Sequence, residues 1–489
     1  MAFRHGVYKQ EVPTSLIPVV QMESGLPVIV GTAPVHLIGN SSNVNKVKLV
    51  YTYAEAVEEF GYDSDWEKYT LCEFIYSQFA LYGMGPAVLI NVFDPSTHKA
   101  VTTAAAYEVK DSKVNLGKNV LITEALTFTG LDEEHDNPVK GTDYTLAYDS
   151  NNNAILTVIA GGVLAGLTSL TISYTAAKPE NVTSTDIIGG VDPATGNYKG
   201  LELVNSVFPK FRIVPGLIGS PKFSENSGVA AVMRAKADNI NGCFTCCSVV
   251  DIPSDSATGA AKYSDVPSWK NQNNYMAERQ IVCWPKIKLD NYVFHMSTQL
   301  IGLMNKTDKN RDDVPYKSPS NELFQMDSCI NAQGNEINLG LEQANYLNSQ
   351  GVVTALNWVG GWRAWGNRTG AYPASTDVKD VFIPVRRMFD FIGNQFILTF
   401  WQKVDEPLTV RLIRTIINSF DIYLNSLTAR DMLLGGRVEF LEDENSITDL
   451  MDGTLKLHVY LTPPSPAETI EGILEYDPDY IKTLFEAVR

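Results

Sequence analysis

The stretch FRIVPGLIGSPKFSENSGVAAVMRAKADNINGCFTCCSVVDIPSD, residues 211–255, decides the fold class. FRIVPGLIGSP is predicted to be a buried strand that ends in a turn. The rest of the stretch predicts a helix, a turn, an apolar strand and an exit loop, and RQIVCWPKIKLD (279–290) is predicted as the next strand. Strands that alternate with helices at this spacing indicate a mostly parallel sheet.

The same order of elements occurs nearer the N-terminus. LPVIVGTAPVHLIGN (26–40) predicts a buried strand followed by a loop, residues 52–85 predict amphipathic helices, and PAVLINVFDP (86–95) predicts another short buried strand. This β–α–β order favours an α/β core.

Between these two parts the composition changes. Residues 96–179 are rich in Thr, Val, Gly and Asn and form short alternating patterns, which predict a small β-sandwich or barrel inserted between core strands. AILTVIAGGVLAGLTSLTI (154–172) is uncharged and near the length of a membrane span, but its second half alternates. We therefore predict a soluble β-hairpin there, and no membrane insertion.

The C-terminal part begins with a helical pattern and ends with strand patterns. Residues 409–436 predict a long amphipathic helix. LKLHVYLTPPSPAETIEGILEY (455–476) predicts one strand, a proline corner and a second strand over 468–476.

The charge of the chain is negative but unevenly distributed. The net charge of −17 and the pI of about 4.9 argue against direct nucleic-acid binding. Residues 361–430 hold nine basic and six acidic residues, a net charge of +3, whereas residues 431–489 hold four basic and thirteen acidic residues, a net charge of −9.

Motifs for catalysis or metal binding are missing from the sequence. No HExxH, phosphate-binding loop or G-x-S-x-G motif occurs, and the six histidines are scattered. Cys243, Cys246 and Cys247 are expected to be buried thiols, and Asp251, at the carboxyl end of a predicted strand, is expected to cap a loop. We assign no catalytic residue, no metal site and no cofactor, and we expect no enzyme.

Three tryptophans, Trp358, Trp362 and Trp365, cluster beside Arg363 and Arg368. Such a cluster suits either a platform on which bases or sugars stack or a protein–protein contact. The acidic total favours the contact.

Several motifs together resemble the tail sheath proteins of contractile-tailed bacteriophages and contractile injection systems. They are the opening GVYKQEVPTSLIPVVQMESGLPVIVGTAP, WRAWGNRTG followed by VFIPVRRMFDFIGNQF, and the closing LKLHVYLTPPSPAETI, with FRIVPGLIG and ADNINGCFTCCSVVDIP in the central part. The matches span most of the chain except residues 96–179, which correspond to a variable inserted domain.

The resemblance implies a fold and a division of the chain. The fold is an α/β (α+β) sheath core with a mostly parallel central sheet, an inserted small β-sandwich or barrel, and extended terminal arms. The expected parts are an N-terminal arm (1–20), the first part of the core (21–95), an inserted outer β domain (96–185), the rest of the core (186–360) and a C-terminal sheath domain with its arm (361–489).

The resemblance also implies a structural function. Subunits polymerise as stacked hexameric rings around an inner tail tube, and contraction drives the tube through the host cell envelope. The expected partners are the chain itself in a helical homo-oligomer, the inner tail tube protein, and the baseplate and tail terminator proteins. The expected location is the tail of the virion, assembled in the cytoplasm of the bacterial host.

In this family the arms add strands to a neighbour's C-terminal sheet, as in β-augmentation. An extended arm of about 20 residues reaches roughly 66 Å at 3.3 Å per residue. The N-terminal donated strand is assigned to Gly6, Val7, Tyr8, Lys9, Gln10, Glu11 and Val12. The C-terminal strand is assigned to Thr469, Ile470, Glu471, Gly472, Ile473, Leu474, Glu475 and Tyr476. The alternative is that both strands pair within one chain.

A breakable contact with the tube suits a charged interface. Arg386, Arg387, Arg411 and Arg414 are the tube-facing candidates, and ordinary surface or intramolecular ion pairs are the alternative. Two other functions stay open: a carbohydrate-binding adhesin that uses the inserted domain and the tryptophans, and the sheath of a headless, bacteriocin-like machine.

Overall fold

The computed structural model describes residues 22–39, 41–133, 135–481 and 483. At its centre lies an eight-stranded sheet in the order β2-β3-β1-β14-β15-β16-β20-β21. The strands are β1 (Pro27–Gly31), β2 (Val47–Val50), β3 (Ala87–Asn91), β14 (Leu217–Gly219), β15 (Cys247–Asp251), β16 (Gln280–Cys283), β20 (Val352–Trp358) and β21 (Gly361–Trp365). All neighbours from β3 to β20 pair in parallel, and the edge strands β2 and β21 are antiparallel. The prediction of a mostly parallel α/β sheet is confirmed.

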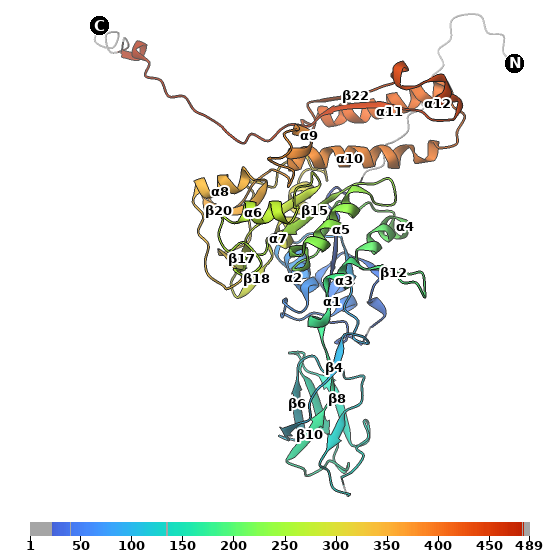
Figure 1. Ribbon diagram of the computed structural model, residues 1–489, viewed down its shortest axis with the longest axis vertical. Coiled ribbons are helices and arrows are strands. Elements are labelled where there is room, and N and C mark those ends of the chain that lie inside the picture. Colours follow the sequence, from blue (N-terminus) through green and yellow to red (C-terminus); the bar gives the residue numbers. More distant parts are fainter. Residues whose placement is uncertain (1–21, 40, 134, 482, 484–489) are drawn as a thin grey trace, which may run out of the picture.

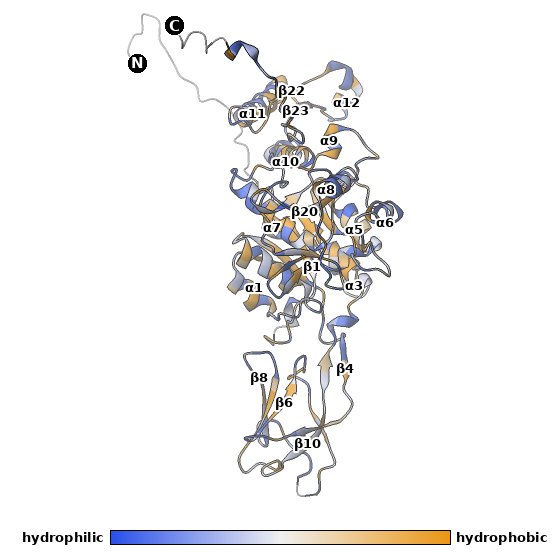
Figure 2. Ribbon diagram, turned by 90° about the vertical axis from the view of Figure 1, so that its left-hand side faces the viewer, coloured by the Kyte–Doolittle hydropathy of each residue, from blue (hydrophilic) through white to orange (hydrophobic). Residues whose placement is uncertain are grey.

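Helices cover both faces of this sheet, as its sequence requires. Every residue of β1, β3 and β15 is buried, which explains their nearly continuous apolar runs. Figure 2 shows α1 and α7 on one side of the sheet and α3 and α5 on the other. These helices are α1 (Tyr53–Phe60), α3 (Ser184–Ile188), α5 (Ser227–Asp238) and α7 (Met296–Lys309).

The strand predicted over residues 211–221 is much shorter in the structure. Phe211 ends the short helix α4 (Val207–Phe211), and Arg212 closes that helix in the left-handed conformation, with φ of 61°. The strand β14 begins only at Leu217. The helix predicted after it is α5, and the side chain of Asn226 caps it by accepting the N–H groups of Gly228 and Val229.

The inserted region forms two three-stranded antiparallel sheets around an apolar core of its own. One sheet has the order β5-β10-β7 and the other β6-β9-β8. Their strands are β5 (Ala105–Glu108), β6 (Lys113–Gly117), β7 (Thr127–Thr129), β8 (Tyr144–Tyr148), β9 (Ala154–Val158) and β10 (Ser169–Ser173).

The hairpin predicted over residues 154–172 is wrong. Strand β9 pairs with β6 and β8, whereas β10 pairs with β5 and β7, so the two strands lie in different sheets. The loop between them crosses from one sheet to the other because each strand contributes its alternate apolar residues to the core between the sheets. Among the described residues, no helix is long and apolar enough to cross a bilayer.

Polar contacts hold the insert against the core. The carboxylate of Asp63 accepts hydrogen bonds from Lys118 Nζ at 3.0 Å and from Asn152 Nδ2 at 2.9 Å. The Tyr69 hydroxyl donates to Asn119 Oδ1 at 2.8 Å. Strands β4 (Lys99–Val101) and β11 (Thr175–Ala177) pair to form the stem. The insert lies at one end of the long axis of the molecule (Figure 1).

The opposite end of the molecule is formed by the C-terminal layer, which we define as residues 383–462 (Figure 1). It contains α10 (Ile383–Phe400), α11 (Val410–Thr428), β22 (Gly435–Glu439), the short α12 (Ile447–Met451) and β23 (His458–Thr462). Apolar residues of α10, α11 and β22, including Phe391 and Phe420, form a separate core there. The predicted amphipathic helix is α11, which the Thr409 side chain caps.

Buried ion pairs fasten this layer to the α/β core. Arg387 on α10 pairs with Asp308 on α7, and their side chains are 3% and 2% exposed. Asp308 also accepts a hydrogen bond from Ser24 Oγ at 3.0 Å. One turn further along α10, Asp390 Oδ1 accepts from Arg279 Nε and from Arg386 Nη2, each at 3.0 Å. The layer and the core are therefore joined by charges that are largely shielded from water, with Arg387 and Asp308 the most deeply buried.

His36 provides a pH-dependent contact between the core and the insert. Its ring lies 6.0–6.2 Å from the rings of Tyr69, Phe93 and the insert's Tyr148, and neither ring nitrogen has a hydrogen-bond partner among the described residues. Burial lowers its pKa from 6.5 to about 4, although the charge of Asp63 acts in the opposite direction.

The unfolded chain therefore binds a proton at His36 that the folded protein does not bind between about pH 6.5 and pH 4. Stability should fall as the pH falls through this window, by up to roughly 3 kcal/mol. Melting temperatures between pH 7 and pH 4 test this, and the variant His36→Phe should show a shallower decline. An equal decline in H36F and the wild type would contradict the prediction. His135→Phe, at the far end of the insert, is the control.

Removing one partner of a buried ion pair should be costly. Asp308→Ala leaves the Arg387 guanidinium buried without its carboxylate, so we expect a loss of about 3–5 kcal/mol of stability. Asp308→Asn, which keeps an acceptor for Ser24, should lose less. Arg411→Ala changes an exposed side chain and should cost less than about 0.5 kcal/mol. Scanning calorimetry measures all three, and a D308A protein as stable as R411A would refute the assignment.

Candidate assembly surface

The C-terminal layer carries a two-stranded sheet with open edges. Strands β22 and β23 pair antiparallel from Gly435↔Thr462 to Glu439↔His458. Within the described residues, neither strand pairs with a third strand on its outer side. Open edges present unpaired backbone N–H and C=O groups, which are a template for strands from another chain, although one N–H of β22, that of Val438, is already bonded to a side chain of α11.

Helix α11 supports this sheet from below. The N–H of Val438 donates to Asp421 Oδ1 on α11 at 2.7 Å, and Val438 is buried against the same core as Phe420 and Leu424. Val459 and Leu461 of β23 face that core but are only partly buried. The apolar face of the sheet is therefore incomplete in the isolated subunit.

The chain leaves the C-terminal layer after β23 as an extended segment that points away from the body (Figure 1). Thr469–Tyr476, the candidate C-terminal strand, is exposed throughout and has no strand partner among the described residues. Ile470, Leu474 and Tyr476 are 89%, 98% and 77% exposed. Together with Gly472 they occupy alternate positions and would share one face of a strand, whereas Thr469, Glu471, Ile473 and Glu475 would lie on the other face, so the segment has partial strand periodicity but no strand partner among the described residues.

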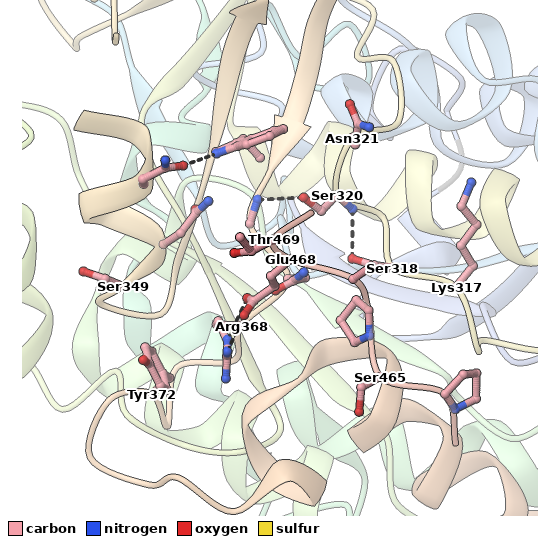
Figure 3. Close-up of a pocket in the computed structure, with 18 of the residues that line it drawn as sticks. Lys317, Ser318, Ser320, Asn321, Ser349, Arg368, Tyr372, Ser465, Glu468 and Thr469 are labelled. Carbon is pink, nitrogen blue, oxygen red and sulfur yellow. Dashed lines mark hydrogen bonds and ion pairs between the residues drawn. The ribbon is translucent and has the colours of Figure 1, made fainter. Parts of the chain in front are cut away.

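An ion pair holds the segment where it leaves the body. Arg368 Nε donates to Glu468 Oε1 at 2.8 Å, and Arg368 Nη2 donates to Glu468 Oε2. The pair lies at a polar groove of about 650 Å³, whose walls include Ser318, Ser320, Trp365 and Tyr372. Figure 3 shows Glu468 and Thr469 among the residues that line this groove, with Arg368 pointing toward Glu468. The motifs WRAWGNRTG and PPSPAE both stand out in the sequence, but their contact was not predicted from it.

The four arginine candidates divide into two kinds. Arg386 and Arg387 lie inside the molecule in the ion pairs of α10, as the intramolecular alternative supposed, and they do not suit a contact with another protein. Arg411 and Arg414 lie on the exposed face of α11, and neither forms an ion pair with another described residue. Only these two remain as candidates for an external partner.

The C-terminal layer also exposes large apolar residues that were not predicted as candidates from the sequence. In and around the connection from α10 to α11, Trp401, Val404 and Val410 are 65%, 61% and 66% exposed. On α12, Ile447 and Met451 are 79% and 81% exposed. Large apolar side chains that gather at one end of a layer mark an interaction surface. The signal in the sequence was weak, because amphipathic periodicity does not separate an exposed apolar residue from a buried one.

The N-terminal candidate strand, Gly6–Val12, lies outside the described residues. The described chain begins at Met22, which packs against the apolar core of the C-terminal layer. The described part of the chain therefore begins beside the layer that carries the open sheet.

The tryptophans do not form a common platform. Trp358 is 56% exposed at the end of the β20–β21 hairpin, Trp362 is half-buried, and Trp365 Nε1 donates to Asn345 Oδ1 at 2.9 Å in the groove. Arg363 Nη1 donates to the carbonyl of Asn321. Their separate roles weaken the stacking hypothesis.

The polar residues at the carboxyl end of the sheet serve the fold. Asp251 Oδ1 accepts from the N–H of Ser297 at 2.9 Å, near the start of α7, and burial raises the pKa of this carboxyl. His295 Nδ1 lies 2.9 Å from Glu73 Oε2. The six cysteines form no disulfide, and the described residues contain no cluster of His, Cys, Asp and Glu that suits a metal ion.

Comparison with known proteins gives matches of two kinds, one in sequence and one in fold. No family model matches the sequence. The chain is 25% identical over 491 residues to the tail sheath protein of Burkholderia phage BcepMu, and the alignment covers 99% of this chain and 98% of that protein.

Two solved structures share the fold. The sheath of an extracellular contractile injection system, PVC, in its contracted state has a TM-score of 0.58 at 14% identity, covering 98% of this chain and 99% of that one. The contracted helical sheath of the anti-feeding prophage has a TM-score of 0.58 at 16% identity, covering 96% and 99%. The chain is therefore similar over nearly its whole length to the tail sheath proteins of phages and contractile injection systems, and it shares the fold of their contracted sheaths.

Proposed function

We propose that this subunit polymerises as stacked hexameric rings around an inner tail tube, and that contraction of the sheath drives the tube through the host cell envelope. The observation that carries the proposal is a mismatch within one subunit. A sheet with two open edges and a segment with strand periodicity occur in the same chain, yet they do not pair with each other.

Pairing between subunits resolves this mismatch. If Thr469–Tyr476 of one subunit adds to the edge of β22 or β23 in the next, the backbone groups of both are satisfied. Ile470, Leu474 and Tyr476 then complete the apolar face that Val459 and Leu461 leave half-covered. Burial of a large apolar side chain contributes about 1.5–3 kcal/mol, so each donated strand gains several kcal/mol before its ordering cost. Gly6–Val12 is proposed as the second donated strand.

The direction of donation determines the assembly. A subunit that gives a strand to one neighbour and receives one from another makes heterologous contacts, and such contacts build rings or helices. The same contacts can persist while subunits move, because an extended connection tolerates a change of angle. Contraction is then a transition of the whole lattice between two arrangements of the same subunits.

The orientation of the molecule supports an assignment of inner and outer faces. The insert and the C-terminal layer lie at opposite ends of the long axis (Figure 1). We place the C-terminal layer against the tube, because it carries Arg411, Arg414 and the exposed apolar residues near Trp401. The insert then lies on the outside of the particle.

The proposed partners follow from these surfaces. They are further copies of this chain, an inner tail tube protein with a complementary negative surface, and the baseplate and terminator proteins at the two ends of the tail. The proposed location is the tail of a virion assembled in the bacterial cytoplasm.

Proline in the donated strand should prevent assembly without harm to the subunit. Leu474→Pro removes one backbone N–H from a strand that forms only in the neighbour, and residue 474 has no contacts to lose in the isolated subunit. We expect no tubes in negative-stain electron microscopy and an unchanged melting temperature. Asp477→Pro, just past the strand, is the matched control. Tubes of normal length from L474P would exclude strand donation by this segment.

A variant that lacks residues 1–20 tests the N-terminal arm in the same assay. Loss of tubes supports a second donated strand. If the wild-type chain itself stays monomeric at rising concentration, sheath assembly by arm exchange is wrong, and a glycan array would then test the adhesin alternative.

Reversal of the two exposed arginines should separate growth on tubes from folding. Arg411→Glu with Arg414→Glu inverts the charge of the proposed tube-facing surface, so sheath growth on purified tubes should fall at least tenfold. Lys110→Glu with Lys113→Glu, in the insert, is the control for total charge. Normal growth of the R411E/R414E protein on tubes would reject the assignment.

A further inference from the structure

Two motifs that are about a hundred residues apart in the sequence meet at a single ion pair. Arg368 belongs to WRAWGNRTG, and Glu468 belongs to PPSPAE, just before the candidate C-terminal strand. The guanidinium and the carboxylate form two parallel hydrogen bonds. Such a fork-to-fork pair fixes the relative orientation of its partners more strictly than a single contact does.

The side chain of Arg368 is itself held in place. Its guanidinium carbon lies 3.9 Å from the centre of the Phe382 ring and 4.5 Å from the centre of the Tyr372 ring, and the side chain is 18% exposed. Aromatic rings that lie against a guanidinium attract it and restrict its rotamers. Arg368 is therefore a rigid donor rather than a mobile surface arginine.

The backbone under Arg368 is also fixed. The N–H of Thr369 donates to the carbonyl of Val381, and the N–H of Ile383 donates to the carbonyl of Asn367, both at 2.9 Å. Nearby, the buried ammonium of Lys270 donates to the carbonyls of Gln350, Gly370 and Tyr372 at 2.6–2.8 Å. These bonds tie the loop that carries Arg368 to the core and to the start of α10.

Glu468 is the partner of Arg368 on the segment that leaves the C-terminal layer after β23. Among residues 463–478 it alone forms a hydrogen bond or ion pair with the body of the protein. The groove beside it, of about 650 Å³, is not filled by residues 464–469, although they form part of its wall (Figure 3). Without the ion pair, the segment between Pro463 and Thr469 has room to move and nothing polar to hold it.

We propose that Arg368 is the positioning residue of the C-terminal arm: its ion pair with Glu468 fixes where and in which direction the arm leaves the subunit, so that the donated strand begins at Thr469. The partner that the oriented arm serves is a second copy of this chain. This inference rests on the proposed function, because it gives the position of the strand that is donated.

The effect belongs to assembly rather than to folding. A partly exposed ion pair contributes little to the stability of a subunit. A fixed exit point, however, raises the effective concentration of the arm at the neighbour's sheet edge, and this concentration falls when the tether becomes longer and more mobile. Freeing Glu468 lengthens the mobile tether back to Pro463.

A glutamate-specific protease tests the ion pair in the isolated subunit. Glu468, Glu471 and Glu475 lie in one exposed segment, but only Glu468 is paired. In the wild type, cleavage after Glu468 should be at least threefold slower than cleavage after Glu471. In Arg368→Gln the two rates should become equal, and in Arg368→Lys, which keeps the charge but not the fork, the difference should be intermediate. Equal rates in the wild type would overturn the inference.

Polymerisation tests the consequence. The critical concentration for sheath formation, measured by sedimentation, should rise at least tenfold in R368Q and in Glu468→Gln. The exchanged pair Arg368→Glu with Glu468→Arg should restore part of the loss that each single reversal causes. Arg234→Gln removes one of the two arginine partners of Asp238 on α5, leaving Arg279, and is the matched control. Melting temperatures show whether each variant is folded.

A truncation that lacks residues 469–489 separates this inference from the function it rests on. If the truncated chain polymerises like the wild type, strand donation by the C-terminal arm is wrong. If truncation abolishes tubes while R368Q polymerises at the wild-type critical concentration, strand donation stands and the positioning role of Arg368 is refuted.

Discussion

The C-terminal layer depends on charges that are buried between it and the α/β core. Two residues of α10 make these contacts: Arg387 pairs with Asp308 on α7, and Asp390 pairs with Arg279 of the core. A buried charge without its partner is costly, so the two parts keep one relative orientation. The open sheet, the exposed end near Trp401 and the exit of the C-terminal arm all take their positions from that orientation.

Two elements outside this rigid part are incomplete in a single subunit. Among the described residues no further strand pairs with β22 or β23, and Ile470, Leu474 and Tyr476 lie exposed at alternate positions of residues 469–476. Exposed edges and exposed apolar strands normally lead to aggregation. In the proposed assembly the two features complement each other between copies, and the Arg368–Glu468 pair limits the directions in which they meet. Rigid joints inside the subunit and extended joints between subunits are what a lattice with two arrangements requires.

Much of the architecture could be predicted from periodicity. The short apolar runs at Leu26–Gly31 and Pro86–Asn91 predicted fully buried parallel strands, and the long period-3.6 pattern after Thr409 predicted α11, because these signals are local. Predictions failed where pairing partners decide the outcome. Alternation at residues 154–172 correctly indicated strands, but periodicity does not say which strand lies beside which, so a hairpin was predicted where the chain crosses between sheets.

The candidate site shows the same division. The sequence by itself determined that residues 469–476 have strand periodicity, that no catalytic motif is present and that basic residues concentrate in 361–430, since these properties are written in residue order and composition. Only the tertiary structure decided that Arg386 and Arg387 form ion pairs with carboxylates inside the molecule. It also decided that Arg411 and Arg414 are exposed, and that Arg368 pairs with Glu468. The physical reason is that an ion pair depends on distance and burial in three dimensions, and sequence separation sets neither of them.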